Sequence, residues 1–380
     1  MSSRPKRFSA SAITPGVVVF VAPEGFTLAR PGKPTLAVSG QVLRYARIVR
    51  RRRGEDLPLL HGLPTGIKDL EETRDLLTTY GSPLYRDYVP NYDNVMVSRV
   101  RAAGAVVVGK TNVPEFGAGS NSRNPVWGAT GNPFNPTLNA GGSSGGSAAA
   151  LATDMLPVCT GSDTGGSLRN PAAFCGVVGF RPSPGMVAVE RRAMGWTPIS
   201  VLGPMGRSVA DVCLLYATQI GQHDSDPLSF PLEPDAYAEP WPVDLGSLRV
   251  AYTEDFGGAP VEKGIRQTFR AKLKAMKHLF RSLDEVEIDY GGADRCFDVI
   301  RAVNFLSRYQ KDYEQNRKLL AGRLCWPHEA LGRCQEIEAQ FPDWYAWWSA
   351  GTLPGEHGAQ LVAFSCCCHV LSPKECATRS

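Results

Sequence analysis

Residues 141–170 read GGSSGGSAAALATDMLPVCTGSDTGGSLRN. Two glycine-flanked serines, Ser143 and Ser167, lie 24 positions apart in this stretch, on either side of an alanine-rich segment. Ordering a glycine costs more backbone entropy than ordering any other residue. Two such clusters therefore indicate backbone that bends sharply or approaches a ligand closely.

The segments around this stretch alternate between helical and strand patterns. Val95–Ala103 has the apolar period of a helix, and Ala105–Val108 is a short apolar run typical of a buried strand. Further helices are predicted at Ser147–Thr153, at Ser208–Ile220 with Ser208 as N-cap, and at Lys263–Leu283, and further strands at Leu156–Cys159, Gly176–Phe180 and Leu248–Tyr252. This order predicts an α/β fold with a largely parallel or mixed sheet flanked by helices.

The composition is that of a globular protein with an uneven distribution of charge. Of the 380 residues, 43% are hydrophobic and 21% charged, which is enough for one large domain or two ordinary ones. Residues 1–54 contain eleven Lys or Arg residues and one acidic residue, Glu24. The run Arg50–Arg53 could attract phosphates, but a solvated arm explains it as well. We therefore expect no nucleic-acid partner.

No stretch approaches the about 18 apolar residues that would cross a bilayer. Residues 1–22 match a secretory signal poorly, because the apolar run is short and lacks a small-residue cleavage site. We therefore expect a cytoplasmic protein that does not bind membranes.

The ten cysteines predict neither disulfides nor a metal site. Single, buried thiols are expected at Cys159, Cys175, Cys213 and Cys296. Near the end of the chain, Cys366–Cys368 with His369 and Cys376 have the composition of a zinc site. Three adjacent cysteines, however, lack the gap that lets thiolates converge on one metal. We expect no metal and no cofactor.

Gly104–Thr111 matches the phosphate-loop pattern G-x-x-x-x-G-K-[ST], with Lys110 as its lysine. A phosphate loop is a flexible turn after a strand. Here the four residues between the glycines are themselves the predicted strand, so sheet partners would occupy their amides. The context argues against nucleotide binding.

Gly142–Gly146 fits G-x-S-x-G, the nucleophile elbow of α/β-hydrolases, with Ser144 as nucleophile and His223 or His278 as base. That elbow requires a strand leading directly into it. Residues 132–140 instead contain two prolines and three asparagines and are typical of a loop. This interpretation stays open as an alternative.

Lys68 offers a third kind of chemistry. It follows a short apolar segment, where a desolvated lysine could be partly neutral and act as a base. A serine could then relay the proton of a second serine to it. Taken alone, Lys68 could equally be a solvated lysine beside Asp69. The two glycine-serine clusters favour the catalytic interpretation.

Several long motifs in register resemble the amidase signature family of serine hydrolases. They are GLPTGIKD at 62–69, GAVVVGKTN at 104–112, GGSSGGSAA at 141–149, GSDTGGSLRNPA at 161–172 and GVVGFRP at 176–182. The spacings of 75 residues from Lys68 to Ser143 and of 24 from Ser143 to Ser167 also resemble those of the family. The resemblance covers residues 55–320.

The resemblance implies an amidase signature fold with a Ser-Ser-Lys triad. Ser167 would be the nucleophile that forms an acyl-enzyme. Ser143, on a cis peptide bond after Gly142, would shuttle the proton, and neutral Lys68 would be the base.

It also implies residues that support the triad. The backbone amides of Thr164, Gly165, Gly166 and Ser167 would hold the oxyanion, and removing one such donor typically costs about 3 kcal/mol of transition-state stabilisation. Other matched positions would brace the site, namely Ser144, Asp163 and Arg169. Lys110 would be structural.

The two ends of the chain differ from this core. Residues 1–54 form an atypical basic segment, and residues 321–380 are rich in Cys and Trp without a sustained pattern, so neither resembles the family. We therefore expect the amidase signature core to occupy 55–320 and the fold to be incomplete at the C-terminus.

The expected reaction is hydrolysis of a carboxylic amide to an acid and ammonia or an amine. The expected partner is a small-molecule amide, with a homodimer as a further option. Two alternatives remain: a transamidation subunit resembling the A subunit of glutamyl-tRNA amidotransferase, which would need a companion chain, and an inactive, truncated relative.

Overall fold

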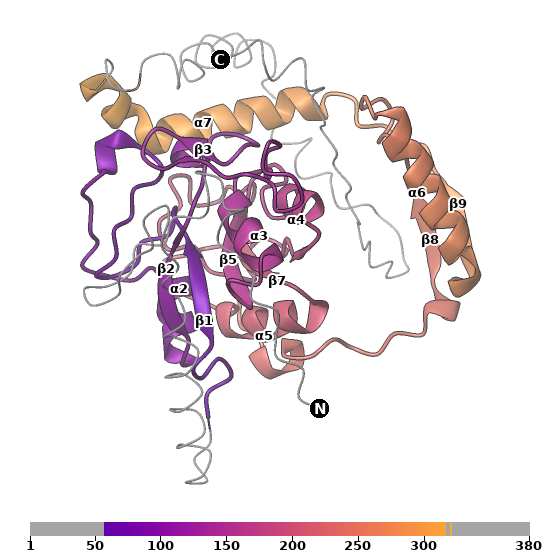
Figure 1. Cartoon of the computed structure of the whole chain (residues 1–380), viewed down its shortest axis with the longest axis horizontal. Helices are drawn as coiled ribbons and strands as arrows, with labels where there is room; N and C mark the ends of the chain where they lie inside the picture. Colours follow the sequence, from indigo (N-terminus) through magenta and orange to yellow (C-terminus); the bar gives the residue numbers. More distant parts are fainter. Residues whose placement is uncertain (1–56, 317–319, 321–380) are drawn as a thin grey trace, which may run out of the picture. The chain divides into compact units, whose positions relative to one another are not determined.

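The computed structural model describes residues 57–316 and Leu320 (Figure 1). These residues belong to two compact units, the first containing the described chain up to Pro240 and the second running from Trp241 to Gln315. The predictions for residues 1–54 and 321–380, including those for Arg50–Arg53 and for the cysteines near the end, lie outside the described residues.

A five-stranded mixed sheet forms the centre of the first unit, in the order β2-β1-β5-β7-β6. Its strands are β1 (Pro64–Lys68), β2 (Val106–Thr111), β5 (Val158–Asp163), β6 (Val178–Gly179) and β7 (Val201–Gly206). β1 is parallel to β2 and β5, whereas β7 is antiparallel to β5 and β6. The predicted mixed sheet is confirmed.

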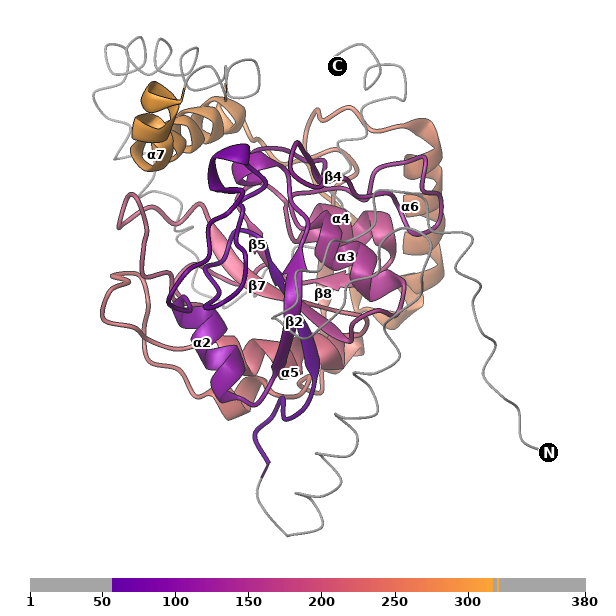
Figure 2. The same ribbon diagram turned by 60° about the vertical axis from the view of Figure 1, so that its left-hand side comes forward.

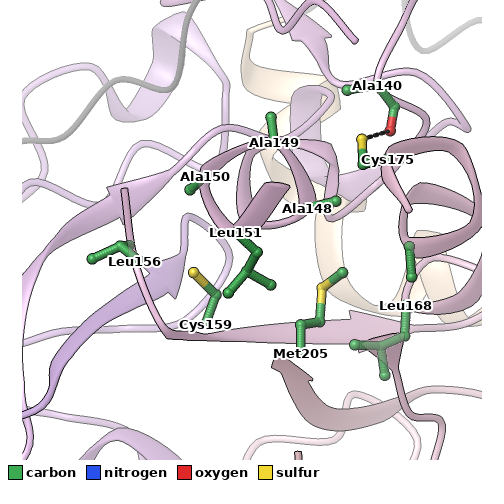
Figure 3. Packing of buried hydrophobic residues seen from close by; sticks show 11 residues of the cluster. Ala140, Ala148, Ala149, Ala150, Leu151, Leu156, Cys159, Leu168, Cys175 and Met205 are labelled. Atoms are coloured by element: carbon green, nitrogen blue, oxygen red, sulfur yellow. Dashed lines mark hydrogen bonds between the residues drawn. The ribbon is translucent and has the colours of Figure 1, made fainter. Parts of the chain in front are cut away.

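Helices cover both faces of this sheet (Figure 2). They are α2 (Val95–Ala102), α3 (Gly145–Ala152), α4 (Arg169–Cys175) and α5 (Val209–Gln219). On the face of α3 and α4, Leu151 packs in one buried cluster with Cys159 of β5 and Met205 of β7 (Figure 3). On the face of α2 and α5, Val97 and Tyr216 pack in a second cluster with residues of the strands.

Several short elements complete the first unit. They are the 3-10 helices Pro83–Tyr85, Glu115–Gly117 and Pro234–Tyr237 and the antiparallel pair β3 (Arg123–Asn124) and β4 (Gly128–Ala129).

The predicted helices and strands around the glycine-serine stretch are present, with shifted ends. α5 begins after Ser208 as expected, because Ser208 and Asp211 form a reciprocal capping box. β2 continues through Gly109–Thr111, so residues 106–111 of the phosphate-loop pattern belong to a strand paired with β1. This confirms the structural argument against a phosphate loop.

β7 was not predicted from the sequence, although it lies between β5 and β6. Its segment contains Gly203 and Pro204, and proline is rare inside a central strand because it has no N–H for the ladder. The Pro204 carbonyl nevertheless accepts a hydrogen bond at 3.2 Å from the amide of Phe180, the residue that follows β6. Local propensity therefore gave the wrong prediction here.

The second unit contains a parallel strand pair connected through a helix. The strands are β8 (Arg249–Tyr252) and β9 (Ser282–Glu285), and the helix is α6 (Lys263–Met276). The predicted helix Lys263–Leu283 is too long, because residues 277–279 form a 3-10 turn and Ser282 already belongs to β9. The unit also contains the 3-10 helix Leu245–Ser247 and the long helix α7 (Ala293–Gln315).

The four single cysteines differ in burial. Cys159 and Cys175 are buried free thiols, Cys213 is partly buried and Cys296 on α7 is exposed. The expectation of burial is therefore wrong for Cys296. No helix among the described residues is both long and apolar enough to cross a membrane.

Candidate active site

Lys68 ends β1 with a side chain that is fully buried. Its Nζ lies 2.8 Å from Ser143 Oγ, 2.8 Å from Ser144 Oγ and 2.9 Å from Ser162 Oγ. The Ser162 carbonyl oxygen is a fourth neighbour at 3.2 Å. Within residues 57–316 no carboxylate forms an ion pair with Lys68. The lysine is therefore enclosed by hydroxyls and a carbonyl.

This enclosure changes the acidity of Lys68. Burial lowers its pKa to about 7, against the opposing effect of the Glu71 and Asp163 charges. A buried ammonium loses its hydration, and hydroxyl groups do not replace it as an anion would. Near neutral pH a substantial fraction of Lys68 is consequently an uncharged amine that can accept a proton.

Ser143 immediately precedes the Ser144 cap of α3 and is buried. The Gly142–Ser143 peptide bond is cis, as the family resemblance implied. The Ser143 hydroxyl has Lys68 as its sole hydrogen-bond partner in the described part of the chain. Among the described residues, no other group competes with Lys68 for this hydroxyl.

Glycine is required at the start of α3. A Cβ added to Gly146 would lie 2.2 Å from the Asn112 backbone nitrogen, because the helix start approaches the end of β2 this closely. The Gly146 amide donates to the Asn112 carbonyl at 3.1 Å. This contact fixes α3 and the serines before it against the edge of the sheet.

Ser144 lies in a setting unlike the nucleophile elbow of α/β-hydrolases. Its hydroxyl contacts Lys68 and donates to the Ser162 carbonyl at 3.4 Å, and it is fully buried. The residues before it form turns and an isolated bridge between Gly131 and Asn139, not a strand. The strand required by that alternative is therefore absent from this described segment.

Ser167 lies in the turn between β5 and α4 and is half-buried. Its carbonyl accepts the Ser144 amide at 3.3 Å, which brings this turn to the serine pair beside Lys68. Its hydroxyl has no hydrogen-bond partner among the residues that the structure describes. The three predicted triad residues thus come from β1, the start of α3 and the β5–α4 turn.

The backbone amides of this turn differ in their bonding. The Gly166 amide already donates to Asp163 Oδ1 at 2.7 Å. Within the described chain, the amides of Thr164, Gly165 and Ser167 have no acceptor. Gly166 has φ of 115°, a conformation that favours glycine. The turn therefore offers three unpaired donors, with the fourth amide used to hold its shape.

Asp163 organises the turn from the end of β5. Its buried carboxylate accepts the Gly166 amide, the Leu168 amide at 3.1 Å and the Arg169 Nε at 3.0 Å. Arg181 adds a contact of 3.0 Å from Nη1 to Oδ1. Burial alone would raise the pKa of Asp163, but the hydrogen bonds and charges of the two arginines lower it below its usual value.

Two residues of this site had no role in the sequence-based prediction. Ser162 provides two of the four contacts to Lys68, and Arg181 shares Asp163 with Arg169. Both lie within the quoted family motifs. Strand alternation puts Ser162 on the same face of β5 as Thr160, whose Oγ1 accepts the Lys68 amide at 3.0 Å, but the sequence does not show that β5 and β1 are neighbours.

In the described ranges no group of three or more His, Cys, Asp or Glu residues is arranged to hold a metal ion.

The family follows from comparison with known proteins. A profile of the Amidase family matches residues 36–331. The chain therefore belongs to the Amidase family.

Individual relatives agree with this family. Over 229 residues the chain is 37% identical to the A subunit of the glutamyl-tRNA(Gln) amidotransferase of Exiguobacterium sibiricum, a match that covers 60% of this chain and 48% of the relative. The chain thus spans about half the length of the curated relatives it matches.

Solved structures show the same likeness. A bacterial aryl acylamidase of the amidase signature family has a TM-score of 0.68 and 26% identity, covering 79% of this chain and 65% of that one. The peptide amidase of Stenotrophomonas maltophilia has a TM-score of 0.60 and 26% identity, covering 74% and 59%. The predicted amidase signature fold is confirmed.

The expectation about partners is wrong. It held that a small-molecule amide is the partner, with no nucleic acid and with a homodimer as the further option. The curated relatives are named as subunits of an amidotransferase whose name includes tRNA. Composition does not distinguish a subunit of an assembly from a free enzyme, because subunit interfaces are in general about as apolar as the rest of a protein surface.

Proposed function

We propose that the chain cleaves carboxylic amides through an acyl-enzyme on Ser167, with Ser143 as the proton relay and Lys68 as the base. One observation carries this proposal: a buried lysine that forms no ion pair with any described carboxylate lies 2.8 Å from the hydroxyl of Ser143. A serine beside a proton acceptor is the arrangement that nucleophilic catalysis requires.

The proposed acylation step moves two protons and forms one bond. Ser167 Oγ attacks the carbonyl carbon while its proton passes to Ser143 Oγ, whose own proton passes to Lys68 Nζ. The negative charge that develops on the carbonyl oxygen is stabilised by the free amides of Thr164, Gly165 and Ser167. Gly166 acts through its bond to Asp163, and Arg169 keeps that carboxylate charged.

Collapse of this intermediate breaks the carbon–nitrogen bond. The leaving nitrogen takes the proton back through Ser143, which releases ammonia or an amine and leaves Ser167 acylated. A water molecule then attacks the ester with the same base, and the acid departs. Each step needs Lys68 to alternate between amine and ammonium, which is easiest for a group whose pKa lies near the working pH.

The test is hydrolysis of a panel of amides by the purified chain, with the released ammonia or amine and the acid both measured. Aryl, peptidyl and aliphatic amides belong in the panel, because related structures include an aryl acylamidase and a peptide amidase. Ser167→Ala should remove the activity, and Ser98→Ala, on the exposed side of α2, should retain it. Equal hydrolysis by the Ser167→Ala variant would overturn the proposal.

A second candidate is a transamidation subunit, favoured by the name shared among the curated relatives. The same acyl-enzyme chemistry would then release ammonia for use by a companion chain. Hydrolysis of simple amides by the isolated chain, at a rate that added partner proteins do not change, would count against this candidate.

The division into 1–54, 55–320 and 321–380 and the cytoplasmic location stay predictions. Limited proteolysis with mass mapping tests the first, since a core of residues 55–320 should resist cleavage longer than its flanks.

A further inference from the structure

A second buried lysine, Lys110, has no role in the proposed reaction. It lies in β2, next to β1, and pairs in register with Ile67, so that Lys68 pairs with Thr111. Successive residues of a strand point to opposite faces of a sheet. Lys68 and Lys110 therefore point to opposite faces at the same end of two neighbouring strands. Only 2% of Lys110 is exposed.

The contacts of Lys110 suit an ammonium. Its Nζ contacts the Glu71 carbonyl, and lies 3.0 Å from Thr73 Oγ1 and 3.0 Å from Thr78 Oγ1. The Thr73 hydroxyl is placed to donate to the Glu71 carbonyl at 3.0 Å, and the Thr78 hydroxyl to the Leu76 carbonyl at 3.1 Å. In this arrangement both hydroxyls accept from the lysine. Three acceptors match the three hydrogens of a charged lysine.

Negative groups on the same side support this charge. Asp69 Oδ1 lies 3.9 Å from Lys110 Nζ, and both side chains are buried. Burial lowers the pKa of Lys110 to about 8, and the charges of Asp69 and Glu71 limit that fall. Near neutral pH Lys110 is therefore more fully protonated than Lys68.

The Lys110 contacts hold the backbone that follows Lys68. The Asp69 amide donates to the Thr111 carbonyl at 3.0 Å, and the Glu71 amide donates to the Lys68 carbonyl at 3.1 Å. Asp69 also accepts the Thr79 hydroxyl at 2.5 Å. The segment from residue 69 to residue 79 is thereby wrapped around the Lys110 ammonium.

We propose that Lys110 is a positioning residue for Lys68: its ammonium orders the 69–79 segment and balances the Asp69 and Glu71 carboxylates, so that Lys68 can remain uncharged. The role of Lys68 as base rests on the proposed function. The electrostatic link between the two lysines does not, because it depends only on the fold.

The charged groups that act on the two lysines are few. Glu71 and Asp163 favour the charged form of Lys68, and Asp163 is itself held by Arg169 and Arg181. Lys110 is influenced by Asp69, Glu71, Glu72 and Asp93, the last of which is paired with Arg101 at 3.0 Å. Glu71 is therefore the carboxylate that both lysines share.

Because both lysines interact with Glu71, two substitutions should shift the pKa of Lys68 in opposite directions. Glu71→Gln removes a negative charge near Lys68 and should lower the pKa of Lys68. Lys110→Met removes the positive charge that acts on Glu71 and Asp69, so the negative charge of Glu71 should act more strongly on Lys68 and the pKa of Lys68 should rise. A purely structural role for Lys110 predicts no such opposed pair.

The direct test is a titration of the Lys68 side chain by NMR of the full chain with 13C-labelled lysine. The Lys68 signal is assigned by its absence from Lys68→Arg. Glu71→Gln should move the Lys68 pKa down by about half a unit or more, and Lys110→Met should move it up by a similar amount. Thr218→Val, a buried change on α5 that touches neither lysine, is the matched control.

Opposite shifts with an unmoved control support the proposal, and Lys110→Gln is measured in place of Lys110→Met if that variant does not fold. An unchanged Lys68 pKa in either the Glu71 or the Lys110 variant, or shifts of the same sign in both, overturns it. The titration needs no turnover. If amide hydrolysis is absent while the opposed shifts remain, the proposed function fails and the link between the lysines stands.

Discussion

Lys68 and Lys110 are equally buried and lie at the ends of neighbouring parallel strands, yet their surroundings differ in hydrogen-bond type. The hydrogen-bond neighbours of Lys110 are a carbonyl and two hydroxyls that are themselves placed to donate to carbonyls, an arrangement in which the nitrogen donates three times. Beside Lys68, the hydroxyls of Ser143 and Ser162 have no other partner in the described chain, so either can donate to an amine. The direction of its neighbours' hydrogens, more than burial, decides whether a buried lysine acts as a base.

The largest expected effect separates the two lysines by activity. Lys68→Met removes the proposed base, and amide hydrolysis should fall by about 10³-fold or more, in line with the contribution of a general base. The variant should still unfold cooperatively, because no carboxylate in the described part of the chain would lose an ion pair with Lys68. Activity within a factor of two of that of the unchanged chain would contradict the assignment of Lys68 as the base.

The next largest effect distinguishes the two lysines by how much each contributes to the free energy of unfolding. Lys110→Met leaves Asp69 buried without its ion pair, and removing one partner of a buried pair typically costs about 3–5 kcal/mol. Urea unfolding should show a much larger loss of unfolding free energy than in Lys68→Met. Similar losses in the two variants would mean that their surroundings are energetically alike.

The pH dependence of activity should follow Lys68. Below its pKa of about 7 the base is protonated, so kcat/KM should rise about tenfold per pH unit and level off above that value. A rate profile on any accepted amide measures this rise. A profile that is flat from pH 5 to pH 8 would exclude Lys68 as the titrating base.

The pH dependence of the unfolding free energy should also reflect the lowered pKa of Lys68. The folded-state pKa of Lys68 lies below the ordinary 10.5, so between these values the unfolded chain binds more protons than the folded one. The contribution of Lys68 to unfolding free energy therefore rises with pH from about 7 to about 10.5. Lys68→Met should show a flatter dependence over this window in urea unfolding. An unchanged slope would contradict the lowered pKa.

The smallest effect concerns single acceptors around Lys110. Thr78→Val removes one of the three acceptors and should cost about 1 kcal/mol of unfolding free energy, near the net value of one hydrogen bond. Thr218→Val on α5 provides the comparison for loss of a buried hydroxyl elsewhere. A Thr78→Val chain as stable as the unchanged one would show that the ammonium does not need this acceptor.

Much of the fold could be predicted because local signals agreed with it. Ser208 and Asp211 form the capping box at the start of α5. The apolar run after Gly104 lies in the strand β2. β7 could not be predicted, because Pro204 contradicts a central strand and the pairing with β5 joins residues far apart in sequence. Long-range pairing overrode local propensity there.

The site shows the same division. Lys68, Ser143 and Ser167 were predicted as a triad because their motifs resemble those of a family, and the structure brings them to one end of the sheet; their catalytic roles stay predictions. The contacts of Ser162 and the pairing of Arg181 with Asp163 depend on how separate strands meet, which spacing alone does not give. The expectation about partners failed against the names of the curated relatives, which composition does not reveal.

The central claim is that Ser167 is the residue that becomes acylated. It is tested most directly by treating the chain with a fluorophosphonate and locating the modified residue by peptide mass spectrometry. One modification is expected, on Ser167. It should be absent from the Ser167→Ala chain, and its rate should be much lower in the Lys68→Met chain. Modification of Ser144, or undiminished labelling of the Ser167→Ala chain, would contradict it.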